Sequence, residues 1–366
     1  MEKITRTTRR INVGSVAIGG GAPVSLQSMT NTRTSDAPAT LAQIRELANA
    51  GCDIIRCAVP DEDALRALPE ILEGTPIPVI ADIHFDYRLA LGAIKAGIHG
   101  IRINPGNIGS ADRVRAVAEA AGEAGVPIRV GANSGSLPHG LYDSKLAAGL
   151  APRDAMAQAL AEAALGQVKL LEQYGFRQIK VSLKSSSVVS TVDACRRFAE
   201  ISDIPLHIGV TEAGVPATGL IKSAVGIGAL LLEGIGETMR VSLTADPVEE
   251  IRAGLQILEA AGLRKPEPEF VSCPTCGRTR IDLTGLASEV YEYIQSLKRA
   301  GRHIGFRKIA VMGCVVNGPG EAHDADIGLA GGDGKAVVFK SGKIVATLPE
   351  TEALELLKRE ILEHSR

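Results

Sequence analysis

Eight short apolar runs, alternating with amphipathic helical patterns, succeed one another between about residue 24 and residue 262. Three junctions nearly repeat, because NAGCDIIRC, KAGIHGIRI and EAGVPIRVG each contain a helix end, a glycine and the start of a strand. The predicted strands are VSLQSM (24–29), CDIIRCAV (52–59), PVIADI (78–83), GIRIN (100–104), PIRVGAN (127–133), QIKVSL (178–183), PLHIGV (205–210) and MRVSL (239–243). Eight strands alternating with helices are typical of an α/β protein with a parallel (β/α)8 TIM-like barrel. An open doubly wound sheet is the alternative, but no G-x-G-x-x-G opens a helix after a strand.

The chain is longer than a barrel needs. Its 366 residues exceed the ~250 of a typical barrel, and the proline-marked segment GLRKPEPEF (262–270) predicts a linker. We therefore expect a barrel domain at residues 1–262 and a second domain at residues 263–366. The early segment INVGSVAIGGG (11–21) predicts a hairpin that plugs the barrel floor. A small α+β fold is predicted for the second domain from helical patterns at 284–300 and 350–364 and strands at 307–312, 326–330, 335–339 and 343–347.

Composition excludes several classes of protein. A formal net charge of −2 gives no general attraction to nucleic acid or to an anionic membrane, so neither is an expected partner. The longest apolar run, AVGIGALLL (224–232), is far shorter than the ~20 residues that span a bilayer, and no signal peptide is evident. Six cysteines in so long a chain are too few for a disulfide scaffold. We expect a cytoplasmic protein in which Cys52, Cys57 and Cys195 are buried in the core.

The predicted barrel strands carry an unusual number of cations. Parallel barrel strands are covered on both sides and are normally apolar throughout. Here the cations in or just past the strands are Arg56, Arg102, Arg129, Lys180, Lys184 and Arg240. One buried arginine is usually explained by an ion pair, but six cations need more anions than Asp82 and Glu212 supply. Because strand ends converge at the carboxyl-terminal mouth, a phosphorylated small molecule such as a diphosphate is expected there.

Two further barrel residues lie among these cations. Glu212, just past the seventh predicted strand, is a carboxylate at the mouth of a positively charged barrel. It is a candidate general acid or base. His207, in PLHIGV, is as readily explained as a core histidine and is given no role.

Three cysteines stand in the second domain, where a metal site usually needs four ligands. CPTC holds Cys273 and Cys276, and GCVVNGPGE holds Cys314. A structural zinc site closed by His323 or His303 is one interpretation. The other is an iron–sulfur cluster whose fourth iron is open or held by the carboxylate of Glu321, so that this iron can bind a substrate oxygen. The glycine-rich loop around Cys314 favours the bulkier cluster.

Several motifs together closely resemble the family of 4-hydroxy-3-methylbut-2-enyl diphosphate synthases, in their two-domain bacterial form. They are LQSMTNTRTSD, PVIADIHFDYRLAL, RINPGNIG, PIRVGANSGSL, VTEAG, RVSLTADPVEEI, CPTC and GCVVNGPGEA, and the resemblance runs nearly end to end. It implies a barrel domain followed by a [4Fe-4S] domain with a fold like those of sulfite and nitrite reductases. By the family motif, the cluster ligands are Cys273, Cys276, Cys314 and Glu321.

The resemblance also implies a reaction. The family opens 2-C-methyl-D-erythritol 2,4-cyclodiphosphate and removes its C3 hydroxyl with two electrons from flavodoxin or ferredoxin, which gives (E)-4-hydroxy-3-methylbut-2-enyl diphosphate. Glu212 would manage a proton, and Glu321 would be catalytic as a ligand of the iron that binds the C3 oxygen. The expected substrate-binding residues are Arg56, Arg102, Arg129, Asn133, Lys180, Lys184, Arg240 and Ser242. A zinc-stabilised barrel enzyme acting on another phosphorylated or pterin-like molecule is the alternative, and a plain electron carrier is a third class.

The path of the chain also bears on assembly. The eighth strand ends near residue 243 at the mouth, and the following helix, about 246–261, must return to the opposite face. The second domain therefore starts at the end of the barrel away from the mouth. A linker of about eight residues reaches at most ~26–29 Å, so we expect a head-to-tail homodimer, which the family resemblance also implies.

Overall fold

The computed structural model describes residues 6–265, 268–314, 322–332 and 334–366. The chain divides into two compact units, Met1–Leu263 and Arg264–Arg366. In the described part of the chain, no helix has the length and apolar character that crossing a bilayer requires.

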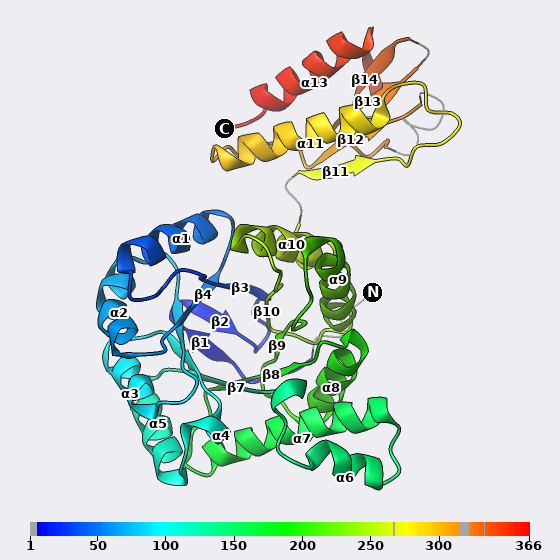
Figure 1. Cartoon of the computed structure of the whole chain (residues 1–366). Helices are drawn as coiled ribbons and strands as arrows, with labels where there is room; N and C mark the ends of the chain where they lie inside the picture. Colours follow the sequence, from blue (N-terminus) through cyan, green and yellow to red (C-terminus); the bar gives the residue numbers. More distant parts are fainter. Residues whose placement is uncertain (1–5, 266–267, 315–321, 333) are drawn as a thin grey trace. The chain divides into compact units, whose positions relative to one another are not determined.

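The first unit is a parallel barrel of eight strands, as predicted (Figure 1). They are β3 (Ser25–Met29), β4 (Ile54–Ala58), β5 (Val79–Asp82), β6 (Gly100–Arg102), β7 (Ile128–Asn133), β8 (Ile179–Lys184), β9 (His207–Ile208) and β10 (Thr238–Met239). Neighbouring strands pair in chain order, and β10 pairs with β3. A parallel bridge between Val181 and Leu206 joins β8 to the start of β9 and closes the ring. The last two strands are much shorter than predicted.

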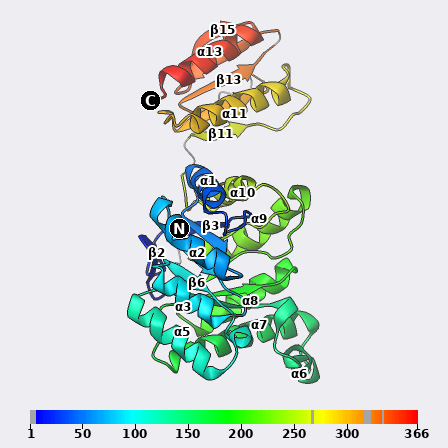
Figure 2. The ribbon, with the colours of Figure 1, turned by 60° about the vertical axis from the view of Figure 1, so that its left-hand side comes forward.

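Helices surround the barrel (Figure 2). The main ones are α1 (Ala37–Asn49), α2 (Glu62–Gly74), α3 (Tyr87–Lys95), α5 (Ala111–Ala124), α7 (Pro152–Glu172), α8 (Val188–Ile201), α9 (Pro216–Leu232) and α10 (Pro247–Ala260). Short helices α4 (Pro105–Ile108), η1 (Ser134–Ser136) and α6 (Leu141–Ala147) interrupt the loops. The side chains of Asp36, Asp61 and Asp246 accept backbone N–H groups in the first turns of α1, α2 and α10, which fixes where these helices begin.

The predicted hairpin is present and lies against the amino ends of the strands. It consists of β1 (Ile11–Val13) and β2 (Val16–Ile18), which are antiparallel. Ile11, Val13 and Ile18 form one apolar cluster with Ile54 of β4 and Ile80 of β5. The turn needs a glycine, because Gly14 has a φ of +54° and an added Cβ would approach His99 to 3.0 Å. The barrel floor is therefore closed by apolar packing, and its open end is the carboxyl edge.

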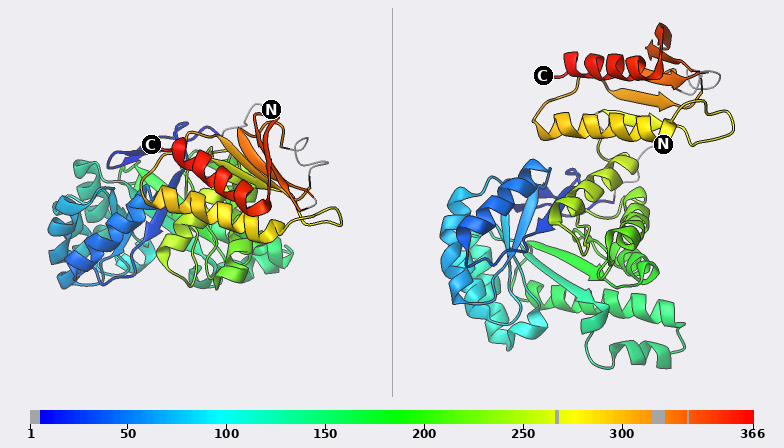
Figure 3. Two further views of the ribbon diagram at one scale, coloured as in Figure 1. Left: turned by 90° about the horizontal axis from the view of Figure 1, so that it is seen from above. Right: turned by 45° about the horizontal axis from the view of Figure 1, so that its top comes forward.

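The second unit is a five-stranded mixed sheet with two helices on one face (Figure 3). Its strands are β11 (Glu269–Ser272), β12 (Lys308–Met312), β13 (Ile327–Gly331), β14 (Ala336–Lys340) and β15 (Lys343–Leu348), and its helices are α11 (Leu283–Arg299) and α13 (Glu350–Glu363). β11, β12 and β13 are parallel, whereas β14 and β15 are antiparallel additions. The sequence analysis missed β11, because this four-residue strand lies directly after the proline-rich linker and has no fully buried residue.

Candidate active site

The strands bring most of the predicted cations to the inner wall of the barrel. Arg102 on β6 is in register with Arg129 on β7, and Arg129 is in register with Lys180 on β8. Residues in register on neighbouring parallel strands lie about 4.8 Å apart, so these three side chains are direct neighbours. Arg56 projects from β4, and Arg240 follows β10 directly.

Asp82, at the end of β5, is one of the carboxylates that balance these charges. Its Oδ1 lies 3.1 Å from Nη1 of Arg102, and its Oδ2 lies 3.7 Å from Nε of Arg56. Nε2 of His84 lies 3.5 Å from the same carboxylate. Burial raises the pKa of Asp82, but the hydrogen bond with His84 and the charges of both arginines outweigh it and hold the pKa well below its usual range. Asp82 is therefore ionised and fixes two of the cations.

Glu250 of α10 is the second buried carboxylate, and the sequence analysis missed it. It is only 4% exposed and binds Arg240, with 3.2 Å between Oε2 and Nε and 3.3 Å between Oε1 and Nη2. Oγ of Ser28 donates to it at 3.2 Å, and the backbone N–H of Leu243 donates at 3.0 Å. The sequence contained a hint of this ion pair. Glu250 lies on the same helix face as the buried residues Pro247 and Gly254, and a buried carboxylate needs a partner.

Several cationic atoms nevertheless have no good partner among the described residues. Arg129 and Lys180 are 3% and 1% exposed, yet Nε of Arg129 and Nζ of Lys180 have no hydrogen-bond partner there. The guanidinium of Arg56 meets the sulfur of Met29 at 2.9 Å, and a thioether is a weak acceptor. The side chain of Lys184 passes close to Gly209, because a Cβ added at Gly209 would lie 3.1 Å from Nζ of Lys184.

The pKa shifts of the cations have the same physical origin. The pKa of Arg56 is lowered to about 10, chiefly by burial, with Asp82 opposing the shift and Arg240 and Arg102 adding to it. Burial, followed by repulsion from neighbouring cations, holds the pKa values of Arg129, Lys180 and Lys184 well below their usual ranges. Among the described residues, Asp82 and Glu250 form ion pairs with Arg56, Arg102 and Arg240, and no ion pair is formed by Arg129, Lys180 or Lys184. An uncompensated buried charge is costly, so the site is suited to a multiply charged anion.

A polar layer continues towards the barrel floor. His207 is fully buried and in register with Thr238, whose Oγ1 lies 3.4 Å from its Nδ1. Burial, and then the charges of Arg129, Lys184, Lys180 and Arg56, hold the pKa of His207 well below its usual value. Nε2 of His207 and both polar atoms of the Gln27 side chain have no hydrogen-bond partner in the described structure. This layer is unusual, because barrel interiors are normally filled by branched apolar side chains.

The remaining predicted barrel residues lie around the mouth. Glu212 is exposed on the loop after β9 and has a φ of +52°, which is uncommon for a non-glycine residue and often marks a functional site. The backbone N–H of Thr244 donates to the carbonyl of Gly214, so this loop is joined to the one that carries Ser242. Asn133 ends β7, and its Oδ1 accepts the N–H of Gly135.

The three cysteines of the second unit follow two neighbouring strands. Cys273 comes directly after β11 and Cys314 comes two residues after β12, and these strands are parallel and in register. The backbone N–H of Gly313 donates to Sγ of Cys273 at 3.2 Å, and the N–H of Arg280 donates to the carbonyl of Gly313. Cys276 is exposed, and a backbone hydrogen bond at Arg278 lowers the pKa of its thiol. Cys273 and Cys314 thus follow the carboxyl ends of neighbouring strands at one edge of the sheet.

Two histidines, His303 and His323, were considered as a fourth ligand, and neither is grouped with the cysteines within the described residues. The backbone of His303 pairs with Arg366 ahead of β12, on the side away from Cys314. His323 precedes Asp324, whose carboxylate binds Lys308 at that same amino end. Glu321 lies outside the described residues. Within the described ranges, no three His, Cys, Asp or Glu side chains are grouped closely enough to hold a metal ion. The donor set still suits a thiolate-ligated group, because N–H groups directed at sulfur are typical supports of such ligands.

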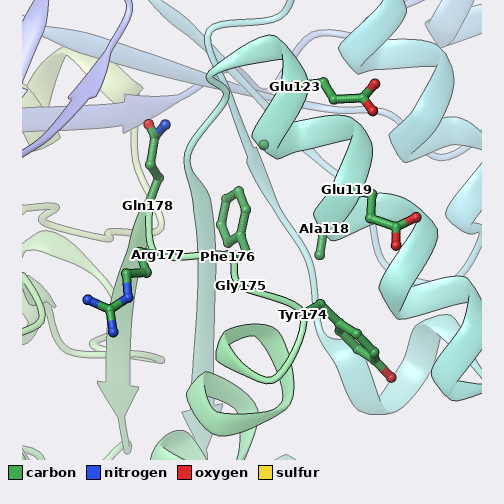
Figure 4. A pocket seen from close by; sticks show the side chains of 9 residues that line it. Ala118, Glu119, Glu123, Tyr174, Gly175, Phe176, Arg177 and Gln178 are labelled. Carbon is green, nitrogen blue, oxygen red and sulfur yellow. The ribbon is translucent and has the colours of Figure 1, made fainter.

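One surface hollow lies away from all of these residues. Figure 4 shows it between Glu119 and Glu123 of α5 and the segment Tyr174–Gln178 that leads into β8. This is the amino end of β8, whereas Lys184 stands at its carboxyl end. The hollow therefore has no part in the cationic site.

Comparison with known proteins agrees with this description. The model of the GcpE TIM-barrel domain matches residues 8–255, and that of the GcpE protein C-terminal domain matches residues 269–363. A Clostridium acetobutylicum protein named 4-hydroxy-3-methylbut-2-en-1-yl diphosphate synthase (flavodoxin) is 51% identical over 97% of this chain and 98% of its own length. A Geobacter sulfurreducens protein of the same name is 52% identical over 97% of both chains.

Among solved structures, the Yersinia pestis dihydropteroate synthase covers 70% of this chain and 100% of its own, with 9% identity and a TM-score of 0.49. A likeness of this size carries no argument about function. The two domain models and the close relatives, in contrast, span almost the entire sequence. The chain belongs to the GcpE family.

Proposed function

We propose that this chain catalyses the reductive ring opening of 2-C-methyl-D-erythritol 2,4-cyclodiphosphate to (E)-4-hydroxy-3-methylbut-2-enyl diphosphate. The reaction takes up two electrons and releases the C3 oxygen as water. The observation that carries this proposal is that the six buried or half-buried cations inside the barrel of a GcpE-family chain outnumber the two carboxylates, Asp82 and Glu250, that form ion pairs with them. The relatives' shared name, which includes flavodoxin, favours this activity over a zinc-stabilised enzyme and indicates flavodoxin as the electron donor.

The cationic residues bind and orient the cyclic diphosphate in this proposal. Asp82 and Glu250 hold Arg102, Arg56 and Arg240 in place, so that their remaining N–H groups point at the ligand. The unpartnered nitrogens of Arg129 and Lys180, with Lys184, supply the charge that the diphosphate neutralises. The amide of Asn133 and the hydroxyl of Ser242 add uncharged donors at the mouth.

Glu212 is proposed to move a proton at the departing C3 oxygen. It is exposed at the carboxyl edge on a backbone with positive φ, on the loop joined to that of Ser242. A carboxylate placed beside a leaving oxygen is a suitable general acid.

We propose that Cys273, Cys276, Cys314 and Glu321 hold a [4Fe-4S] cluster. When bound, the cluster supplies single electrons and an exchangeable coordination position that thiolates alone would block. The N–H of Gly313 stabilises negative charge on the sulfur of Cys273, and the lowered pKa of Cys276 favours its thiolate. Thiolate ligands and low-potential electrons suit a reducing compartment, so the cytoplasm is the proposed location.

The active site is proposed to form between two chains. α10 ends beside the amino edge of the barrel, because Leu255 contacts Gly51 just ahead of β4. From Leu263 to Glu269 the chain takes six Cα steps and spans at most ~20–22 Å. The 17 residues of α9 alone measure ~25 Å along the barrel wall. A chain's own cysteines therefore have difficulty reaching its own mouth, whereas a head-to-tail homodimer brings them to the partner's mouth.

An anaerobic assay tests the activity directly. Purified protein would be supplied with the cyclodiphosphate and a reduced chemical donor, and the allylic diphosphate would be measured. Iron and zinc would be determined on the same sample. Product formation by an iron-containing, zinc-free protein supports the proposal. A zinc-containing protein that leaves the cyclodiphosphate intact would overturn it.

A further inference from the structure

Below the arginines of the cationic site, the barrel interior contains a second group of buried polar side chains. Followed once around the ring, the strand registers return to β3 about eight residues nearer the amino terminus, which is the stagger of a TIM barrel. Neighbouring strands are thus displaced by about one residue each, and alternate strands contribute inward side chains to the same layer. The registers therefore give the height of each inward residue above the barrel floor.

Two polar layers lie between the apolar floor and these arginines. The lower layer contains Lys180 of β8 and Thr238 of β10, and the layer above it contains Gln27 of β3, Arg129 of β7 and His207 of β9. We call these five side chains the lower compartment. The arginines of β4 and β6, and the one that follows β10, occupy the next layer towards the mouth. The apolar cluster of the hairpin closes the lower compartment from below.

The polar atoms of the lower compartment are buried and lack partners. Lys180, Gln27 and His207 are at most 1% exposed. Nζ of Lys180, Nε2 of His207 and both polar atoms of Gln27 form no hydrogen bond with the residues that the structure describes. Buried polar groups of this kind are normally satisfied by trapped water or by a ligand. The lower compartment itself has no carboxylate, and Asp82 and Glu250 pair with the arginines above it.

Lys180 is the member of this compartment whose charge can change when an anion binds. Burial, followed by the charges of Arg129 on β7 and Arg56 on β4, holds the pKa of Lys180 well below its usual range. His207 on β9 also faces it and is uncharged, because its own pKa is held well below its usual value. An ammonium that is buried beside cations without a counter-ion gives up its proton, whereas a guanidinium keeps its proton. A diphosphate bound by the arginines above would reverse the local charge and favour the ammonium.

We propose that Lys180 is an uncharged amine in the free barrel and takes up one proton when the cyclic diphosphate binds to the arginines above it. The amine nitrogen forms one new N–H bond, the proton comes from solvent, and no electron moves. The ammonium then neutralises part of the charge of the ligand from the floor side of the barrel. This inference rests on the proposed function and adds that substrate binding itself consumes a proton, before any electron is delivered.

Calorimetry of the full, iron-containing chain tests the proton uptake. The ligand is the cyclodiphosphate without an electron donor, so that it binds but is not converted. Each phosphate of this ring has a single, strongly acidic group, so the free ligand does not titrate near neutral pH. Binding enthalpies in two buffers of different ionisation enthalpy give the number of protons taken up. We expect about one proton per barrel near pH 8, where an ordinary lysine is already charged. The Kd should rise by up to about tenfold per pH unit as the pH increases, because binding and protonation are linked.

Lys180→Gln is the main variant, because an amide stays polar and takes up no proton at this pH. It should bind the cyclodiphosphate without proton uptake and with a Kd that changes little with pH. Lys180→Met is the second variant, and iron content and melting temperature show whether each variant is folded. His207→Gln, within the lower compartment, should keep the uptake. Lys184→Gln should also keep it, because Lys184 is half-buried and accessible to solvent. Lys169→Gln, on the exposed side of α7, is the surface control.

The outcomes separate this inference from the proposed function. Proton uptake that persists in Lys180→Gln, or that is lost only in Lys184→Gln or His207→Gln, would overturn the inference. Binding of the cyclodiphosphate to the original chain without proton uptake, and with a Kd independent of pH, would also overturn it and leave the proposed function intact.

A chain that does not bind the cyclodiphosphate would contradict the proposed function. Inorganic diphosphate is then the probe, and the difference in uptake between the original chain and Lys180→Gln cancels the protons that free diphosphate exchanges. A difference of about one proton would support the role of Lys180. Equal uptake by both proteins would overturn it, and a chain that binds neither ligand would overturn both proposals.

Discussion

The barrel and the C-terminal unit hold their reactive groups in opposite ways. In the barrel, the cations belong to strands and lie inside the fold, where Arg129 and Lys180 are almost fully buried. In the C-terminal unit, Cys273, Cys276 and Cys314 lie on segments that follow strands, and none of the three thiols is fully buried. The barrel thus has excess charge that lacks a partner, whereas the C-terminal unit has ligands that lack enclosure. From this contrast we predict that anion binding by the barrel and electron delivery by the C-terminal unit can be abolished separately.

The largest effect on turnover should come from removing a cysteine of the C-terminal unit. Cys314→Ser is expected to yield colourless, cluster-poor protein without measurable turnover, because one of only three thiolates is lost. Inorganic diphosphate should still bind the barrel, as measured by calorimetry. Glu321→Ala should keep more iron than Cys314→Ser, since three thiolates remain. Cys195→Ala, at a buried barrel thiol, is the control and should keep its iron. Full iron and sulfide in Cys314→Ser would contradict the ligand assignment.

At the mouth of the barrel, Glu212→Gln should lower turnover by about 10²–10⁴-fold while leaving cluster content and diphosphate affinity unchanged. The reason is that the amide cannot donate a proton to the departing oxygen. Glu119→Gln, on the outer surface of α5, provides the matched control. Steady-state rates in the anaerobic assay check this prediction, and a near-normal rate would remove Glu212 from the mechanism.

Inside the barrel, Arg56→Ala should weaken diphosphate binding by about 1.5–3 kcal/mol, the range for hydrogen bonds to charged groups. This corresponds to roughly 10- to 150-fold in Kd. The iron content should not change, because the substitution lies in the other unit. Arg115→Ala on the outside of α5 removes an exposed arginine and should have no effect. An unaltered Kd and rate for Arg56→Ala would exclude it from the anion site.

The smallest predicted effect concerns His207 and pH. Its pKa in the folded barrel lies well below 6.5, so the unfolded chain binds a proton that the folded chain does not bind as pH falls through 6.5. Stability is therefore lost below this pH, by about 1 kcal/mol between pH 7.5 and pH 5.5 for this one group. His207→Gln should lose less free energy of unfolding over the same interval in denaturant titrations. Equal losses in both proteins would show that His207 does not titrate in this way.

The sequence was most informative where residues contradict their surroundings. Six cations in strands that should be apolar predicted an anion site, which stays a prediction, and the structure places Arg102, Arg129 and Lys180 side by side. The eight strands were predicted from their apolar runs, but β9 and β10 are only two residues long, because pairing geometry is not visible in a hydrophobic pattern.

Other features depended on contacts between distant segments. Glu250 accepts hydrogen bonds from Arg240, ten residues away in the sequence, and from Ser28, 222 residues away. The sulfur of Met29 contacts Arg240, which is 211 residues away. Local spacing does not encode such pairs, although the position of Glu250 on a buried helix face was a usable hint. The spacing of CPTC predicted a thiolate site, but the N–H of Gly313 that supports Cys273 emerges only from the pairing of β11 with β12.

The central claim is that the barrel of one chain works with the cysteine unit of another. Mixing two inactive proteins, Glu212→Ala and Cys314→Ser, under conditions that exchange subunits tests it most directly. Random pairing makes half of the dimers mixed, and each mixed dimer contains one intact barrel facing one intact cysteine unit. We predict recovery of roughly a quarter of normal activity in the anaerobic assay. Confirmed subunit exchange without any recovered activity would show that the site is built within a single chain.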